Sequence, residues 1–116
     1  MTICYLRYKI DLPAPILGYF QAQNSGETDA FLDLFTADAV VADEGQEHRG
    51  DAIRTWINGA ITRYHPLHAE VTGLEAADSQ TVAIAQLSGS FPGSPVQLRY
   101  HFTLRDGKIA ALSIGR

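Results

Sequence analysis

The sequence predicts an α+β fold, in which three helices pack on one side of a curved, mostly antiparallel sheet. Three observations carry this prediction. Apolar residues recur at spacings of three and four through the first half of the chain, up to Pro66. In the second half they alternate with polar residues, most strictly over residues 96–105. The length of 116 residues suits one domain with a single core.

The first predicted helix begins near Pro13, with Asp11 as its candidate N-cap. It ends at the turn Asn24-Ser25-Gly26, because glycine adopts the left-handed conformation of a helix end without strain. One face of this helix carries a largely apolar set of residues: Leu12, Ile16, Tyr19, Phe20 and Gln23.

Two more helices are predicted before Pro66. The second is short, with Thr28 as its cap, and its apolar stripe is Phe31, Leu34 and Phe35. The third has Asp51 as its cap and apolar residues at spacings of three and four over residues 53–64. It ends before Pro66, since the residue that precedes a proline leaves the helical region.

Strands make up the rest of the predicted fold. A short one over residues 39–43 lies between the second and third helices and runs into Glu44-Gly45. Turn residues at 78–80 and 92–95, and the tight hairpin turn at Asp106-Gly107, divide the second half. The strands between them cover residues 67–74, 81–91, 96–104 and 109–114.

Charge and cysteine content narrow the classes of function. The chain carries 13 acidic and 9 basic residues, a net charge of -4, which argues against nucleic acid or an anionic membrane as a partner. Cys4 is the one cysteine, so it has no internal disulfide partner and a cytoplasmic location is expected. Arg7 and Lys9 interrupt the first ten residues, which do not resemble a signal peptide. We expect residues 1–11 to be an N-terminal extension and residues 12–116 to form the domain.

Two stretches of the chain resemble the NTF2-like (SnoaL-like) superfamily and, within it, the ketosteroid isomerases. They are GYFQAQNSG at residues 18–26 and LFTADAVVAD at residues 34–43, and residues 43–56 also look like SnoaL-like domains. The resemblance runs over about residues 12–115. It implies a cone-shaped barrel with a cavity between the helices and the concave sheet.

The resemblance also implies proton transfer next to a carbonyl group, without a cofactor. In ketosteroid isomerases a tyrosine five residues before the Asn-x-Gly turn donates a hydrogen bond to the oxyanion, and Tyr19 occupies that place. Asp43, at the end of the strand after Leu-Phe, occupies the place of the general base. The second donor in that family is a protonated aspartate before a His-Phe pair. Here Tyr100 precedes that pair, and a tyrosine can also donate. Such a reaction needs a base near the C–H bond and donors near the oxygen.

Structural interpretations of these residues stay open. Asp43 can simply bond its own backbone in the Asp-Glu-Gly turn, and Tyr19 can be a core aromatic. Tyr100 lies on the apolar face of its strand, so its hydroxyl needs a partner or a ligand inside. The alignment places Ile84, Gln86, Ser88 and Ser90 on the cavity face, which is more polar than a steroid pocket needs. The expected ligand-binding residues are Phe35, Trp56, Ile84, Gln86 and Phe102.

The leading hypothesis is therefore a ketosteroid isomerase-like isomerase that acts on a small apolar or carbonyl-containing molecule. A dehydratase of this fold would need an inward histidine, and a polyketide cyclase an acid on a late strand, so both come second. The chain can also be a non-catalytic binding domain, or a cone whose interior is filled by side chains. The histidines are His48, His65, His68 and His101, and their spacing predicts no metal site. We expect a homodimer through the polar sheet face, which carries Gln97, Arg99, His101 and Thr103.

Overall fold

A computed structural model describes residues 12–77 and 79–116, and it confirms the α+β class. The predicted extension over residues 1–11, with Cys4 and the candidate cap Asp11, lies outside the described residues, as does Asp78 of a predicted turn. In chain order the elements are α1 (Ala14–Ser25), the 3-10 turn η2 (Phe31–Leu34), β1 (Phe35–Asp43), β2 (Gln46–Arg49), α2 (Asp51–Arg63), β3 (His68–Ala77), β4 (Gln80–Ser88), β5 (Val96–Arg105) and β6 (Lys108–Gly115).

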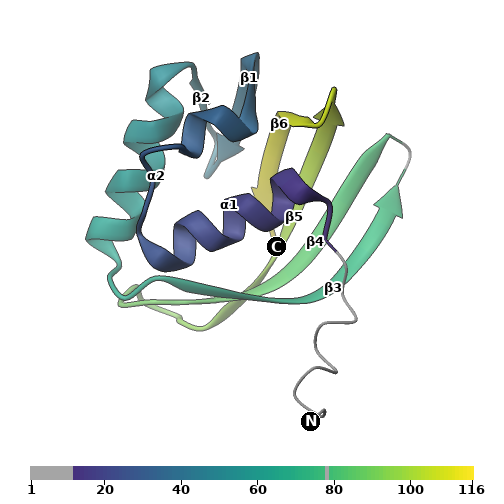
Figure 1. Ribbon diagram of the computed structural model, residues 1–116. Helices are drawn as coiled ribbons and strands as arrows, with labels where there is room; N and C mark the ends of the chain where they lie inside the picture. Colours follow the sequence, from purple (N-terminus) through teal and green to yellow (C-terminus); the bar gives the residue numbers. More distant parts are fainter. Residues whose placement is uncertain (1–11, 78) are drawn as a thin grey trace, which may run out of the picture.

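The strands form one mixed sheet in the order β2-β1-β6-β5-β4-β3. Neighbouring strands are antiparallel, except that β1 and β6 run parallel. The sheet curves around α1, which crosses its concave face, while α2 covers the end next to β2 (Figure 1). The expected cone-shaped barrel is not closed, because β2 and β3 are the two edges of an open sheet.

Residues 12–77 and 79–116 contain two α-helices where the sequence predicted three. The stripe of Phe31, Leu34 and Phe35 holds for only one 3-10 turn, because Phe35 is already extended and pairs with Ile109 of β6. The next residues, TADAVVAD, continue that strand. A helical spacing over three residues was therefore too short to establish a helix.

Two tight turns connect neighbouring strands, and one of them leads into β2, a strand that the sequence did not predict. Glu44 and Gly45 have φ angles of 52° and 77°, so β2 folds back on β1 through a two-residue hairpin turn. Asp106 and Gly107, with φ angles of 54° and 77°, make the predicted hairpin between β5 and β6. The turn at Glu44 directs the chain into β2, and α2 then begins at Asp51.

The helix ends follow the sequence in part. Gly26 has a φ of 79° and ends α1 as predicted. Asp51 is the first residue of α2 and makes no capping hydrogen bond, so its expected role as N-cap is wrong and Gly50 takes that position. Thr28 precedes η2, and its hydroxyl donates to Asn58 Oδ1 of α2 at 2.5 Å. Neither helix of the described chain is long and apolar enough to cross a membrane.

The core lies between α1 and the middle strands of the sheet. Tyr19 and Phe20 of α1 pack their rings against Tyr100 and Phe102 of β5, with ring centroids 5.0–6.1 Å apart across this interface. Asn24 fixes the end of α1 to β3, since its amide donates to the carbonyl oxygen of Ala69 at 2.9 Å and its Oδ1 accepts from Ala69 N at 2.7 Å. These contacts set the position of α1 above the sheet and so define the space beside it.

Candidate active site

A cavity of about 460 Å³ opens between α1, α2 and the concave face of the sheet. Most of its wall is apolar, from Ile57, Ala60, Leu67, Leu87, Phe91, Pro92, Val96, Leu98 and Ile114. Its polar and aromatic lining includes Tyr19, Gln23, Asp43, Glu44, Trp56, Tyr64 and Tyr100. The three residues expected to be catalytic thus line the same cavity.

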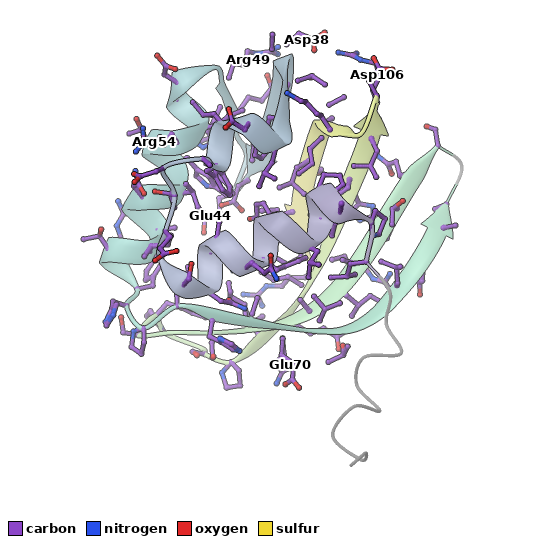
Figure 2. All side chains as sticks on the ribbon, in the orientation of Figure 1. Asp38, Glu44, Arg49, Arg54, Glu70 and Asp106 are labelled. Carbon is purple, nitrogen blue, oxygen red and sulfur yellow. The ribbon has the colours of Figure 1, made fainter. Side chains whose placement is uncertain are left out.

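Asp43 is the last residue of β1, and its half-buried side chain reaches the cavity before the chain turns at Glu44. Trp56, one turn into α2, donates a hydrogen bond from Nε1 to Asp43 Oδ2 at 3.1 Å. The ring of His48 stacks on Trp56, with centroids 5.8 Å apart. The Trp56 indole therefore orients one oxygen of the Asp43 carboxylate. Glu44 is exposed at the rim of the cavity, and Figure 2 shows it in the space between α1 and α2.

Tyr19 and Tyr100 form the buried end of the cavity, with exposed fractions of 0% and 1%. The Tyr19 hydroxyl donates to Gln23 Oε1 at 3.2 Å. Burial raises the pKa of Tyr19 well above its usual range, and the charges of Tyr100 and Asp43 raise it further. Burial likewise raises the pKa of Tyr100, Asp43 adds to the rise, and the Gln23 amide partly offsets it. Both phenols are therefore neutral donors that lie within the field of the Asp43 carboxylate.

The expected ligand-binding residues divide into those inside and outside the cavity. Trp56 lines it. Phe35 and Phe102 are buried in the core and do not line it, although Phe102 stacks on Tyr100 with ring centroids 6.3 Å apart. The position of Phe102 follows from its strand, since it is two residues from Tyr100 and lies on the same face of β5.

The expected placement of Ile84 and Gln86 in the cavity is wrong, as is that of Ser88 and Ser90. Ile84 pairs with Arg99 and Gln86 with Gln97, so both lie on the face of the sheet opposite Tyr100. The inward residues of β4 are the apolar set Ala83, Ala85 and Leu87, which pair with Tyr100, Leu98 and Val96. A one-residue error in register exchanges the two faces of a strand. The cavity wall is consequently more apolar than the sequence suggested.

The sequence pattern did not assign a functional role to Gln23, Tyr64 or Phe91. Gln23 carried a signal, because it lies on the apolar face of α1 at four residues from Tyr19. Tyr64 and Phe91 meet edge to face at a centroid distance of 5.6 Å, although one follows α2 and the other lies in the loop after β4. That contact is long-range, and no local pattern indicates it.

The donor types present suit proton transfer better than metal binding. Within residues 12–77 and 79–116, no three histidine, cysteine, aspartate or glutamate side chains gather closely enough to hold a metal ion. A carboxylate that accepts an indole N–H hydrogen bond, in one cavity with two buried phenols, is instead a group of the kind that can act as a base beside neutral hydrogen-bond donors.

An open curved sheet wrapped around a helix, with a cavity between the helices and the concave face, is the architecture of an NTF2-like protein. The SnoaL-like domain family matches residues 16–112, and the chain belongs to that family. No curated protein matches the chain.

Solved structures give the same fold. A Sinorhizobium meliloti protein, named as a proposed polyketide cyclase, is 42% identical, with a TM-score of 0.84 over 90% of this chain and 96% of that one. A Catenulispora acidiphila protein with a ketosteroid isomerase-like fold, in complex with trimethylamine, is 19% identical, with a TM-score of 0.78 over 90% and 85%. AclR, a proposed hydroxylase from Streptomyces galilaeus, is 18% identical, with a TM-score of 0.67 over 87% and 84%. The last two similarities concern the fold alone.

Proposed function

We propose that this protein is a cofactor-independent enzyme that removes a proton from a carbon next to the carbonyl group of a small, largely apolar molecule. The observation that carries the proposal is that Asp43 and Tyr100 line one cavity whose remaining wall is mostly apolar. Its volume of about 460 Å³ falls in the range of small-molecule sites. The carbonyl end of the ligand lies beside the tyrosines, and its hydrocarbon end lies against Tyr64, Leu67 and Phe91.

Asp43 acts as the general base in this proposal. The Trp56 hydrogen bond to Oδ2 holds the carboxylate plane, which leaves Oδ1 to accept the proton. The electron pair of the broken C–H bond moves into the carbonyl group and forms an enolate. The negative charge then develops on the ligand oxygen, where Tyr100 donates a hydrogen bond. Tyr19 lies in the same group of polar residues at the buried end of the cavity, where its hydroxyl donates to Gln23.

The enolate has two productive fates. Where the ligand has a carbon–carbon double bond one carbon further along, the enolate is conjugated with it; return of the proton to the far carbon of that bond then moves the double bond next to the carbonyl group, an isomerisation that the ketosteroid isomerase resemblance implies. Attack of the enolate carbon on a second carbonyl group of the ligand closes a ring, and the alkoxide formed takes the proton from Asp43; the Sinorhizobium meliloti relative is named as a proposed polyketide cyclase. Isomerisation is the leading candidate and cyclisation is the second. Both begin with the step assigned to Asp43.

The first test uses 2-tetralone, an apolar ketone with acidic α-protons. Its binding is followed by the fluorescence of Trp56, the one tryptophan of the chain, and its proton exchange in D₂O by NMR. Asp43→Asn should lower the enzymatic exchange rate by about 10²–10⁴-fold, because it removes a general base. Ketone affinity should change little. Exchange that survives in Asp43→Asn would refute the proposal, and binding without exchange in the wild type would identify a non-catalytic binding domain.

A second test concerns Trp56 as the residue that positions Asp43. Trp56→Phe keeps an aromatic ring and removes the Nε1 donor. A hydrogen bond to a charged group contributes about 1.5–3 kcal/mol, and about 1.4 kcal/mol corresponds to a tenfold change in rate, so exchange should slow by about ten- to a hundredfold. His48→Ala is the control, because it removes only the stacked neighbour. Equal losses in both variants would contradict the positioning role.

The expected second copy of the chain is a separate proposal. The outer sheet face carries Arg99, which pairs with Glu75 at 3.0 Å, together with Gln97, His101 and Thr103. Analytical ultracentrifugation tests it: a dimer in the wild type that His101→Glu converts to a monomer supports this face, and a monomeric wild type rejects it.

A further inference from the structure

We propose that Gln23 is a ligand-binding residue of this cavity, whose Nε2 donates a hydrogen bond to the ligand's carbonyl oxygen beside Tyr100. Tyr19 is then a positioning residue, which holds the amide rather than contacting the ligand. This inference rests on the proposed function, because it assigns the donors of the same site. It changes the pair of oxygen donors from two tyrosines to one tyrosine and one amide.

The first observation is that Gln23 is a buried polar residue with an unused donor. Its side chain is 4% exposed and lines the cavity. Nε2 is buried and has no hydrogen-bond partner among the described residues. Buried polar groups are nearly always hydrogen-bonded, so an unpaired buried donor on a cavity wall calls for a partner in the cavity. The carbonyl oxygen of the proposed ligand is such a partner.

The second observation is the direction of the bond between Tyr19 and Gln23. The Tyr19 hydroxyl has one proton, and it donates that proton to Gln23 Oε1 at 3.2 Å. Tyr19 therefore has no proton left for a ligand oxygen. The same bond occupies the acceptor of the amide and leaves the two N–H groups of Nε2 as its free polar atoms. Because Gln23 follows Tyr19 by one helical turn, α1 presents both side chains on one face.

The third observation places Gln23 beside Tyr100. Both side chains line the same cavity, and the Tyr19 hydroxyl, which donates to Gln23, belongs to a ring packed against Tyr100. The Tyr19 and Tyr100 rings are 5.9 Å apart, so the amide and the Tyr100 hydroxyl belong to one cluster at the buried end of the cavity. Two neutral donors at the same end of the cavity favour a ligand that presents an oxygen acceptor there, either a carbonyl group or the enolate formed from it.

The decisive experiment compares two ligands of nearly equal shape. 2-Tetralone carries the carbonyl oxygen, and tetralin is the same bicyclic skeleton without it. Gln23→Met removes the donor at nearly constant volume. We expect it to weaken 2-tetralone binding about tenfold and to leave tetralin binding unchanged. Gln23→Leu is a second apolar variant that should give the same difference between the ligands.

Gln21→Met is the matched control, because it makes the same change on the exposed face of α1. It should alter neither affinity. Tyr19→Phe should weaken 2-tetralone binding through the freed amide, and the double variant Tyr19→Phe/Gln23→Met should match Gln23→Met alone, as expected when one residue acts through the other. Additive losses would refute the positioning role of Tyr19.

The results separate this inference from the proposed function. If Gln23→Met weakens both ligands equally, or neither, then Gln23 does not contact the carbonyl group, whatever Asp43→Asn does to proton exchange. If Asp43→Asn leaves exchange intact while Gln23→Met still discriminates the two ligands, the binding role of Gln23 stands and the catalytic proposal falls.

Discussion

Gly89→Ala is the substitution whose effect the structure fixes most closely. Gly89 follows β4, and a Cβ added there would lie 2.7 Å from the backbone oxygen of Tyr64, 3.1 Å from Leu67 Cδ1 and 3.2 Å from Phe91 Cδ2. The oxygen of Tyr64 cannot withdraw freely, because it accepts a hydrogen bond from Ser90 N at 3.0 Å. The clash is therefore with the backbone and cannot be relieved by a change of rotamer.

The expected cost of Gly89→Ala is about 1–3 kcal/mol of the free energy of unfolding, the usual range for an overpacked interior. Gly59→Ala is the matched control. Gly59 lies inside α2, has no atom within 4 Å of an added Cβ, and should gain about 0.5–1 kcal/mol, since alanine favours the helix. The same added methyl group should thus change stability in opposite directions at the two sites.

Urea denaturation followed by Trp56 fluorescence measures both variants. Tetralin binding reports on the cavity, since Tyr64, Leu67 and Phe91 line its apolar end and must move to admit the new methyl group. We expect tetralin affinity to fall in Gly89→Ala and to stay constant in Gly59→Ala. A loss of stability below about 0.5 kcal/mol in Gly89→Ala would show that the loop after β4 is not fixed to the end of α2 and would refute the predicted clash.

Two further predictions concern the buried tyrosines and the attachment of α1. Because the pKa values of Tyr19 and Tyr100 are raised on folding, the native state keeps protons that the unfolded chain releases near pH 10. The free energy of unfolding should not depend on these groups below about pH 10, and above it should fall by about 1.4 kcal/mol per pH unit for each tyrosine. Tyr100→Phe should remove the contribution of one tyrosine from this fall. Urea titrations at several alkaline pH values measure it, and an equal dependence of the unfolding free energy on pH in the wild type and in Tyr100→Phe would contradict the prediction. Asn24→Ala removes both hydrogen bonds to the Ala69 backbone and should cost about 1–3 kcal/mol by urea denaturation, whereas Ser25→Ala, with an exposed hydroxyl, should cost far less.

The part of the fold that the sequence predicted best is the part with an unbroken pattern. Alternation over β5 correctly placed Tyr100 on the buried face, and the Asp106-Gly107 turn correctly predicted the hairpin to β6. The helix α2 also follows its pattern, with Ile53 and Ile57 buried one turn apart. In each case local residue preferences and the final packing agree.

The register of β4 could not be predicted because its pattern is not alternating. Val82, Ala83, Ile84 and Ala85 are four apolar residues in succession, so either parity could face the core. The pairing of Ala83 with Tyr100 decides the register, and that pairing is long-range. The strand β2 gave no hydrophobic signal, since it consists of Gln46, Glu47, His48 and Arg49. It also depends on a turn in which Glu44 has a positive φ, a conformation that only a minority of non-glycine residues adopt.

The candidate site has a local half and a distant half, and this explains which of its residues the sequence could indicate. Asp43 and Trp56 belong to the segment β1–β2–α2, where the hairpin turn at Glu44 returns the chain so that α2 brings the indole to the carboxylate thirteen positions later. Tyr100 reaches the same cavity from β5, and Gln23 from α1, which Asn24 fixes to the sheet. The resemblance to ketosteroid isomerases could therefore indicate Asp43 as the candidate base, because this half of the site is continuous in the chain. Which side chains lie beside the ligand oxygen depends on how α1 packs over β5, so the sequence showed that Gln23 is on the apolar face of α1 but not that it lines the cavity with Tyr100.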